Sequence, residues 1–242
     1  MFSLSLFTCG QSHEGEVQIK FTLPAQTEII AAEGERVLLD VSGGNEKNLT
    51  SPVTENDILV YSNAGFDLCD KELSDKFGLR KLFCKAGSFN KNGIHVTTIP
   101  SVRSENEQLK EVNSSNYIIL VEVDGLRICH LGNIGQGNFT KEQLALLGKI
   151  DICIAPFVNN FSNMNMSNKK GFVLIDELKP KIVIPCYYNE KSVEYAMNKY
   201  PVFSTDGELK YFSPKNIPQN TSFILMDDMA YIYKDEYKLK SF

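Results

Sequence analysis

The chain has 242 residues, of which 43% are hydrophobic, and its 25 Lys and Arg against 30 Asp and Glu give a net charge of −5. This length suits one large domain or two small ones, and the composition is that of a globular protein with a sizeable core. The negative charge argues against nucleic acid as a partner, and no apolar run approaches the roughly 20 residues of a membrane-spanning helix. With only three histidines, the chain cannot form a zinc site of four or five histidine ligands.

Residues 1–16 are expected to be a leader. The apolar run before Cys9 is similar to the end of a bacterial lipoprotein signal. As such a signal it is incomplete, because no basic residue precedes the run and Thr8 is larger than the usual residue at that position. The alternative is that the run is a first strand. The sequence therefore leaves two locations open: the cytoplasm or, with Cys9 lipidated, the cell envelope and its membrane.

The first half of the chain is predicted to consist of short strands with one helix. Stretches of alternating polar and apolar residues, and short apolar runs, are separated by turn-forming pairs such as Glu33-Gly34. A helix is predicted over residues 70–79, with Asp70 as its N-cap and its end near Gly78. The strands are expected within residues 17–23, 27–43 (a hairpin), 55–63, 81–87 and 93–100.

The second half combines a strong hairpin signal with alternating strands and helices. Two apolar runs are joined by Asp124-Gly125, a pair typical of two-residue hairpin turns. Thr140 and Gln143 form a capping box, which predicts a helix that begins there and ends at Gly148. Other helices are expected over about 172–179 and 192–200, and strands over 150–156, 181–185, 223–228 and 229–235. Two groups of strands with few helices between them predict one α/β (α+β) domain, a β-sandwich covered by helices, rather than a doubly wound parallel sheet.

Three blocks in this order resemble the metallo-beta-lactamase superfamily, in particular its short ascorbate-6-phosphate-lactonase-like branch of metal-dependent hydrolases. The resemblance is carried by the opening hairpin, by the segment VDGLRICHLGNIGQGNFTKEQLALLGKIDICIAPF and by KPKIVIPCYYN, which cover residues 17–43, 123–157 and 179–189. It implies a four-layer αββα sandwich formed by a single domain over residues 17–242. Members of the family bind one or two zinc ions, whose open position holds the water that attacks the substrate.

The positions that the resemblance assigns to metal ligands have mostly lost their donor atoms. The HxHxDH motif corresponds to residues 63–68, where only Asp67 keeps a ligand type, and the histidine of the opening hairpin corresponds to Ala25. Glycine and leucine offer no donor atom and arginine is positively charged, so we expect neither zinc nor another cofactor. An ion pair between Arg103 and Asp67 is predicted in place of the metal. The replaced positions are Asn63, Gly65, Asp67, Leu68, Arg103, Asn133 and Tyr187.

The sequence therefore favours a non-catalytic protein that has lost the zinc site and binds a small polar or anionic ligand through Arg103. The predicted pocket is lined by Asn63, Asp67, Arg103, Asn133, Tyr187 and Tyr188. One alternative is an atypical metal-dependent or Cys/His hydrolase of a small polar ester, lactone or phosphoester, with Asp67, His130 and Cys186 as candidate catalytic residues. A second alternative is a surface lipoprotein scaffold whose contacts are made by the Asn- and Met-rich loop 158–168. The oligomeric state does not follow from the sequence.

Overall fold

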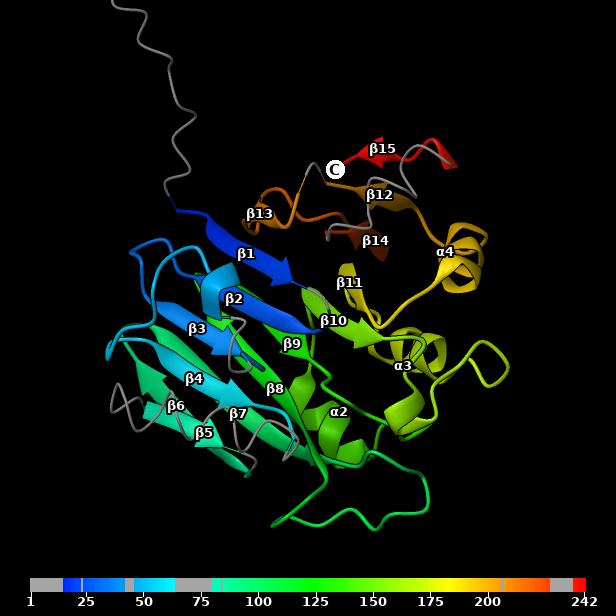
Figure 1. Ribbon diagram of the computed structural model, residues 1–242, viewed down its shortest axis with the longest axis horizontal. Helices are drawn as coiled ribbons and strands as arrows, with labels where there is room; N and C mark the ends of the chain where they lie inside the picture. The colour runs from blue at the N-terminus through cyan, green and yellow to red at the C-terminus, as the bar shows by residue number, and fades with distance from the viewer. Residues whose placement is uncertain are drawn as a thin grey trace, which may run out of the picture.

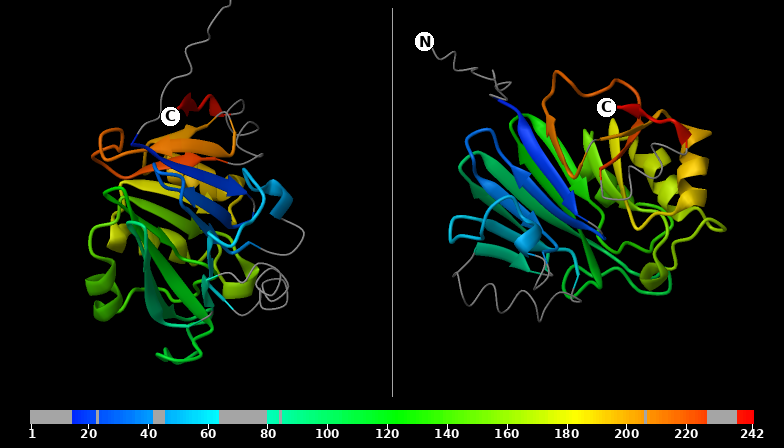
Figure 2. Two further views of the ribbon diagram at one scale, coloured as in Figure 1. Left: turned by 90° about the vertical axis from the view of Figure 1, so that its left-hand side faces the viewer. Right: turned by 45° about the horizontal axis from the view of Figure 1, so that its top comes forward.

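The computed structural model describes residues 15–22, 24–41, 46–63, 80–83, 85–205, 207–226 and 237–242, which form two β-sheets packed face to face. In Figure 1 the first sheet, blue to cyan, lies in front of the green second sheet, and Figure 2 shows the pair from two other directions. This arrangement confirms the predicted α/β sandwich. The leader, the predicted helix 70–79 and the predicted strand 229–235 lie outside the described residues.

The first sheet has six strands in the order β13-β1-β2-β3-β4-β5. Its strands are antiparallel from β13 to β3 and parallel from β3 to β5. The β2–β3 hairpin is the one predicted from Glu33-Gly34. The strands are β1 (Val17–Thr22), β2 (Gln26–Ile30), β3 (Arg36–Leu39), β4 (Ile58–Tyr61), β5 (Arg80–Phe83) and β13 (Leu209–Phe212).

The second sheet has nine strands in the order β15-β12-β14-β11-β10-β9-β8-β7-β6. Its strands are parallel from β15 to β9 and antiparallel from β9 to β6. They are β6 (Gly87–Lys91), β7 (Ile94–Ser101), β8 (Asn116–Val123), β9 (Leu126–His130), β10 (Ile152–Pro156), β11 (Ile182–Cys186), β12 (Val202–Ser204), β14 (Ser222–Leu225) and β15 (Lys240–Ser241).

Two cores lie on either side of the second sheet. The first, between the sheets, contains side chains from both, among them Ile19, Val37, Ile154 and Ile184. The second lies between the second sheet and helices, since residues of β8 to β11 cluster with apolar residues of α2, α3 and α4. The helical elements are α2 (Lys141–Leu147), α3 (Lys170–Leu178), α4 (Glu190–Met197) and the short 3₁₀ turns η1 (Glu46–Asn48) and η3 (Asn160–Ser162).

Local signals placed the hairpin and the helix starts accurately. Asp124 and Gly125 both have positive φ, as a two-residue turn requires, and they join β8 to β9. The capping box of α2 is present, with the Thr140 side chain accepting from Gln143 N and the Gln143 side chain accepting from Thr140 N. The strands β12, β13 and β15 were not predicted, because each is short and is held by pairing with a distant segment. The strand β6 was also missed, although it pairs with the adjacent β7 across the Asn92-Gly93 turn.

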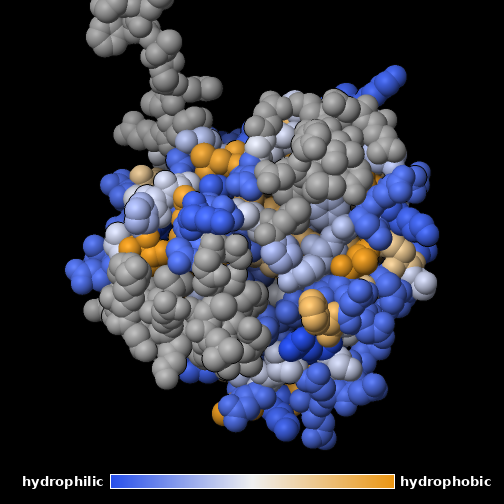
Figure 3. Space-filling model, viewed as in Figure 1, coloured by the Kyte–Doolittle hydropathy of each residue, from blue (hydrophilic) through white to orange (hydrophobic). Residues whose placement is uncertain are grey.

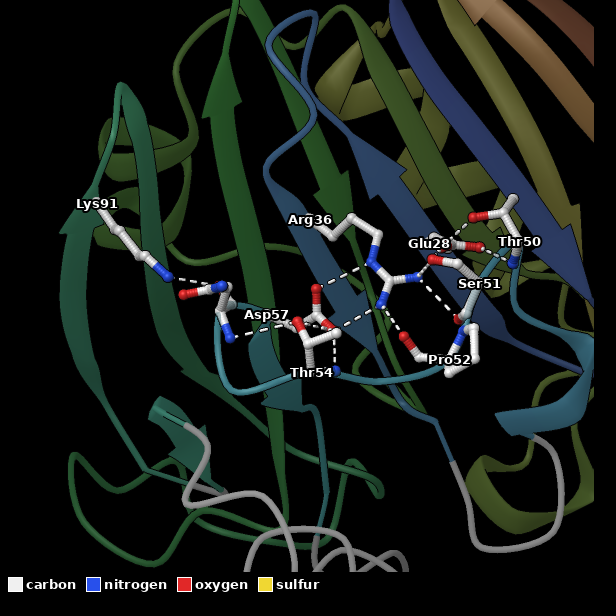
Figure 4. A network of polar contacts seen from close by, with 9 residues as sticks. Glu28, Arg36, Thr50, Ser51, Pro52, Thr54, Asp57 and Lys91 are labelled. Carbon is white, nitrogen blue, oxygen red and sulfur yellow. Dashed lines mark hydrogen bonds and ion pairs between the residues drawn. The ribbon is translucent and has the colours of Figure 1, made fainter.

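A buried ionic network fastens the outer edge of the first sheet. The Arg36 guanidinium bonds both carboxylate oxygens of Asp57, at 2.9 and 2.6 Å, and one oxygen of Glu28 at 2.9 Å. It also donates to the Ser51 side chain and to the carbonyls of Ser51 and Pro52. Figure 4 shows how these partners surround Arg36. Burial alone lowers the pKa of Arg36, but Asp57 and Glu28 more than offset this effect and raise it.

The described surface in the view of Figure 3 is mainly hydrophilic, with small separate apolar patches. Within the described part of the chain, no helix has the length and apolar character needed to cross a membrane.

Candidate functional site

Four predicted site residues lie in loops that begin where strands end. Asn63 follows β4, Arg103 follows β7, Asn133 follows β9 and Tyr187 follows β11. We call these four residues the strand-end cluster. Asp67, Gly65 and Leu68, and with them the predicted Arg103–Asp67 ion pair, lie outside the described residues.

Asn116, at the start of β8, joins two of these loops. Its Nδ2 donates to Ser101 Oγ at 2.6 Å and to Leu131 O at 2.9 Å, and its Oδ1 accepts from Asn133 N at 2.8 Å. Asn116 is fully buried, so each of these bonds is made away from competing water. The loops after β7 and β9 are thereby held at a fixed distance.

Gly132 brings the loop after β9 against the loop after β4. A Cβ at this position would lie 2.5 Å from Ser62 Oγ and 2.6 Å from Asn116 Oδ1, and the residue has φ +61°. Both the close approach and the left-handed backbone therefore require glycine. This contact places Asn63 and Asn133 on neighbouring loops, as the resemblance implied.

The loops after β10 and β11 complete the cluster. Asn159 Nδ2 donates to Asn133 Oδ1 at 2.9 Å, and Phe157 N donates to Tyr187 O at 3.3 Å. Burial, together with the nearby Cys186 and Asp40, raises the pKa of Tyr187 to about 12, and Arg103 opposes this rise. The Tyr187 phenol is therefore neutral at physiological pH, and its side chain lies within the electrostatic range of Arg103.

Arg103 is the charged member of the cluster. Its backbone N donates to Ser115 Oγ at 2.9 Å, and its carbonyl packs so closely on Gly135 that a Cβ there would lie 1.9 Å from the oxygen. Its side-chain Nε is buried and has no hydrogen-bond partner among the described residues. An unpaired buried donor is costly unless a ligand or water accepts its hydrogen bond.

A buried histidine and aspartate lie behind the cluster. Gly132 N donates to His130 Nδ1 at 3.1 Å, so the ring proton is on Nε2, which donates to Ala25 O at 2.9 Å. Asp40 accepts from Ser62 N at 2.7 Å and from Ser62 Oγ at 2.6 Å. Burial raises the pKa of Asp40, while His130 and Ser62 lower it. Both ring nitrogens of His130 are thus occupied by backbone groups.

Two other predicted site residues lie elsewhere. Cys186 is fully buried in the core between the sheets, and burial, with Asp40 adding to it, raises the pKa of its thiol well above the usual value. A neutral buried thiol on β11 and a histidine on β9, whose ring nitrogens both bond backbone groups, do not form an activated Cys–His pair. Tyr188 packs with Val193, Leu225 and Leu239, apart from the inter-sheet core that its neighbour Tyr187 contacts. The structure therefore does not bring Tyr188 to the strand-end cluster.

The described residues of the cluster do not fit the zinc ion typical of the fold. Zinc in proteins takes thiolate, imidazole or carboxylate ligands. The cluster instead offers two amides, a neutral phenol and a guanidinium, and Asn133 Oδ1 already accepts from Asn159. Among the residues that the structure describes, no three His, Cys, Asp or Glu side chains are grouped so that they could hold a metal.

Comparisons with known proteins establish the family. Residues 24–187, more than half of the chain, match the family described as "Beta-lactamase superfamily domain". The chain belongs to this superfamily. Solved structures with the metallo-beta-lactamase fold are similar to this chain. One of them, from Thermotoga maritima, has a TM-score of 0.61 at 17% identity, and the match covers 87% of this chain and 98% of that protein. YhfI of Bacillus subtilis, a metallo-beta-lactamase fold protein, has a TM-score of 0.55 at 8% identity, and the match covers 88% of this chain and 97% of YhfI. At these identities the structures support the fold alone.

Two curated relatives carry the name UPF0173 metal-dependent hydrolase. The protein of Thermococcus onnurineus is 25% identical over 131 residues, which are 52% of this chain and 54% of the relative. The protein of Pyrococcus abyssi is 26% identical over 119 residues, which are 48% of this chain and 51% of the relative. The chain thus spans about half the length of the relatives it matches. The superfamily is confirmed, whereas the lactonase-like branch and the loss of the zinc ligands stay predictions.

A second hollow, on the outer edge of this metallo-beta-lactamase fold, was not anticipated. It has a volume of about 580 Å³ and is lined by residues of the β2–β3 turn, the segment 50–57 and the β6–β7 turn. Arg36 and Asp57 form part of its wall, but their charged groups are fully engaged with each other and with their neighbours. This hollow therefore lacks the unpaired buried donor that distinguishes Arg103.

Sequence reasoning missed the residues that hold the cluster together. Asn116 and Asn159 are 0% and 2% exposed, yet each is an asparagine next to a predicted strand or in a predicted surface loop. A buried polar residue is recognised only once its partners are known. One signal was available, because Gly132 and Gly135 in the GNIGQG segment suggest a tightly packed loop.

Proposed function

We propose that this metallo-beta-lactamase fold protein binds a small anionic ligand at the strand-end cluster without metal-dependent catalysis. The observation that carries the proposal is Arg103, whose Nε is buried with no partner in the part of the chain that the structure describes, at a position that the resemblance assigns to a metal ligand. A guanidinium binds carboxylate or phosphate oxygens through two parallel hydrogen bonds, which suits an anion entering this site.

The neighbours of Arg103 support a polar anion rather than a bare inorganic ion. The neutral Tyr187 phenol can donate or accept a hydrogen bond, and the amides of Asn63 and Asn133 can contact hydroxyl or carbonyl groups. Asn133 and Asn63 also bond protein partners, Asn159 and Ser62 respectively, which hold their side chains in place. Such prearranged groups bind without losing much conformational entropy.

The experiment is calorimetric titration of the full chain with inorganic phosphate and with acetate at low ionic strength, where charge contacts are least screened. In Arg103→Met the affinity for both anions should fall roughly tenfold or more, since hydrogen bonds to charged groups contribute about 1.5–3 kcal/mol. Arg127→Met is the matched control, because it removes the same charge near the start of β9, where Arg127 pairs with Glu122. Equal affinities in the two variants, or no anion binding by the wild type, would overturn the proposal.

A hydrolase of a small polar ester, lactone or phosphoester is the alternative, favoured by the names of the two curated relatives. Its candidate residues are Asp67, His130 and Cys186. The bonding of His130 to two backbone groups and the burial of Cys186 speak against a Cys–His mechanism. Metal-stimulated turnover of such substrates, lost in Asp67→Asn, would favour the hydrolase over the binding protein.

A further inference from the structure

Lys170 is placed where a positive charge is doubly unfavourable. It is the first residue of α3, and only 7% of it is exposed. Burial removes the hydration of its ammonium group, and the positive end of the helix dipole repels it. Gly171 fixes this position, because a Cβ there would lie 2.5 Å from Pro156 O at the end of β10. A lysine held in such a place is stable only through specific partners.

The partners of Lys170 belong to the two loops that carry Arg103 and Asn133. Lys170 Nζ donates to Gly135 O at 3.1 Å, in the loop after β9. It also pairs with Glu105 at 3.1 Å, two residues after Arg103. Glu105 is itself 54% exposed, so its contribution is to neutralise the buried ammonium at the rim of the site rather than to bury a second charge.

Gly135 connects Lys170 to the backbone around Arg103. Gly135 N donates to Val102 O at 2.8 Å, and the missing Cβ of Gly135 allows the Arg103 carbonyl to lie directly against it. The carbonyl of Gly135 is therefore held by Lys170 while its N–H holds the residue before Arg103. One residue thus links the buried lysine to the backbone next to the arginine.

We propose that Lys170 is a positioning residue that, through Gly135 and Glu105, holds Arg103 in the orientation that binds an anion. This inference rests on the proposed function. Two of the three donors of the Lys170 ammonium are taken by a carbonyl and a carboxylate of these two loops, which gives the residue its positioning role. Its removal releases the Arg103 loop from the loop after β9, so the guanidinium samples more orientations and captures the anion less often.

The test compares Lys170→Met with Lys169→Met, which removes the same charge one residue earlier. Lys169 is exposed and lies 4.7 Å from the centre of the Tyr195 ring, away from both loops. Phosphate affinity is measured by calorimetry, and the Arg103 Nε–H resonance is followed by NMR after its assignment with Arg103→Lys. The second measurement reports the state of the arginine without any ligand.

Lys170→Met should shift or broaden the Arg103 Nε–H resonance and weaken phosphate binding roughly two- to thirtyfold, the range for residues that act through their neighbours. Lys169→Met should change neither. If Lys170→Met fails to fold, Glu105→Gln provides the same test from the exposed partner and should give smaller changes in the same direction. An unchanged resonance with unchanged phosphate affinity would make Lys170 merely structural and overturn the inference. If the wild type binds no phosphate, the proposed function fails, and the resonance alone still decides whether Lys170 positions Arg103.

Discussion

Arg36 and Arg103 both lie where a strand of the sandwich meets a loop, and they differ in what surrounds the guanidinium. Arg36 is 6% exposed and is bonded to two carboxylates, one hydroxyl and two carbonyls (Figure 4). Arg103 has a buried Nε without a partner among the described residues. The Arg36 guanidinium makes its hydrogen bonds within the protein, as expected of a residue that stabilises the fold. The Arg103 Nε is the group that we propose to donate a hydrogen bond to a ligand.

The same difference extends to the residues nearby. Glu28, which bonds Arg36, also accepts from the backbone and side chain of Thr50, so the network at the outer edge closes on itself. Around Arg103 the hydrogen bonds hold backbone and amides, and the Nε has no partner within the described ranges. A buried charge whose bonds are all made inside the protein stabilises the fold, whereas the unpartnered Nε of Arg103 is the observation on which the proposed binding site rests.

The largest effect is expected from Arg36→Met. It leaves Asp57 and Glu28 buried with no countercharge, and removal of one partner of a buried ionic network costs about 3–5 kcal/mol of unfolding free energy. Urea denaturation followed by circular dichroism measures this loss. A loss below about 1 kcal/mol would mean that the network is not the structural element inferred from its closed bonding.

A smaller loss is expected from Gly135→Ala, which tests the packing that supports Arg103. The new Cβ would lie 1.9 Å from Arg103 O, so the backbone must move, at a cost of about 1–3 kcal/mol. The same movement should weaken phosphate binding. Gly137→Ala is the control for stability, since its Cβ would meet only the flexible end of Glu105, and it should be nearly neutral in urea denaturation. Equal effects of the two alanines would remove the special role of Gly135.

Arg103→Met should hardly change stability, within about 0.5 kcal/mol, because no residue in the described part of the chain bonds the Nε. Urea denaturation of Arg103→Met and Arg36→Met under the same conditions measures how much each arginine contributes to the free energy of unfolding. A loss comparable to that of Arg36→Met would show that Arg103 also serves the fold.

The smallest effect concerns the ionisation of Tyr187. Its pKa is raised to about 12 from an ordinary value of about 10. A raised folded-state pKa gives stability that is complete below about pH 10 and is lost as the pH rises through about 12. The decline of stability over this range should be shallower in Tyr187→Phe than in the wild type, whereas in Arg103→Met it should move to higher pH. Identical profiles of stability against pH in all three proteins would mean that the charge of Arg103 does not affect the pKa of Tyr187.

Local sequence signals predicted much of the fold, and the limits of prediction follow from long-range contacts. The α2 capping box and the Asp124-Gly125 turn depend only on neighbouring residues, and both were predicted at the right positions. By contrast, β13 pairs with β1 and β15 with β12, over separations that no local pattern encodes.

The candidate site shows the same division. The resemblance placed Asn63, Arg103, Asn133 and Tyr187 at strand ends, and the structure has them there. Tyr188 was assigned to the pocket by adjacency to Tyr187, but it contacts a different apolar cluster. Lys170 gave no signal at all, because a lysine at the start of a helix is ordinarily exposed and its burial is a property of the folded chain.

The most direct test of the account is the metal content of the full-length protein, purified without chelator, incubated with zinc, manganese and iron in turn, desalted, and measured by plasma mass spectrometry. A cluster of amides, a neutral phenol and a guanidinium should retain only a small fraction of an equivalent of each metal. One or two tightly held equivalents per chain would contradict the account. That result would assign the site to metal-dependent chemistry and point first to Asp67 as a ligand.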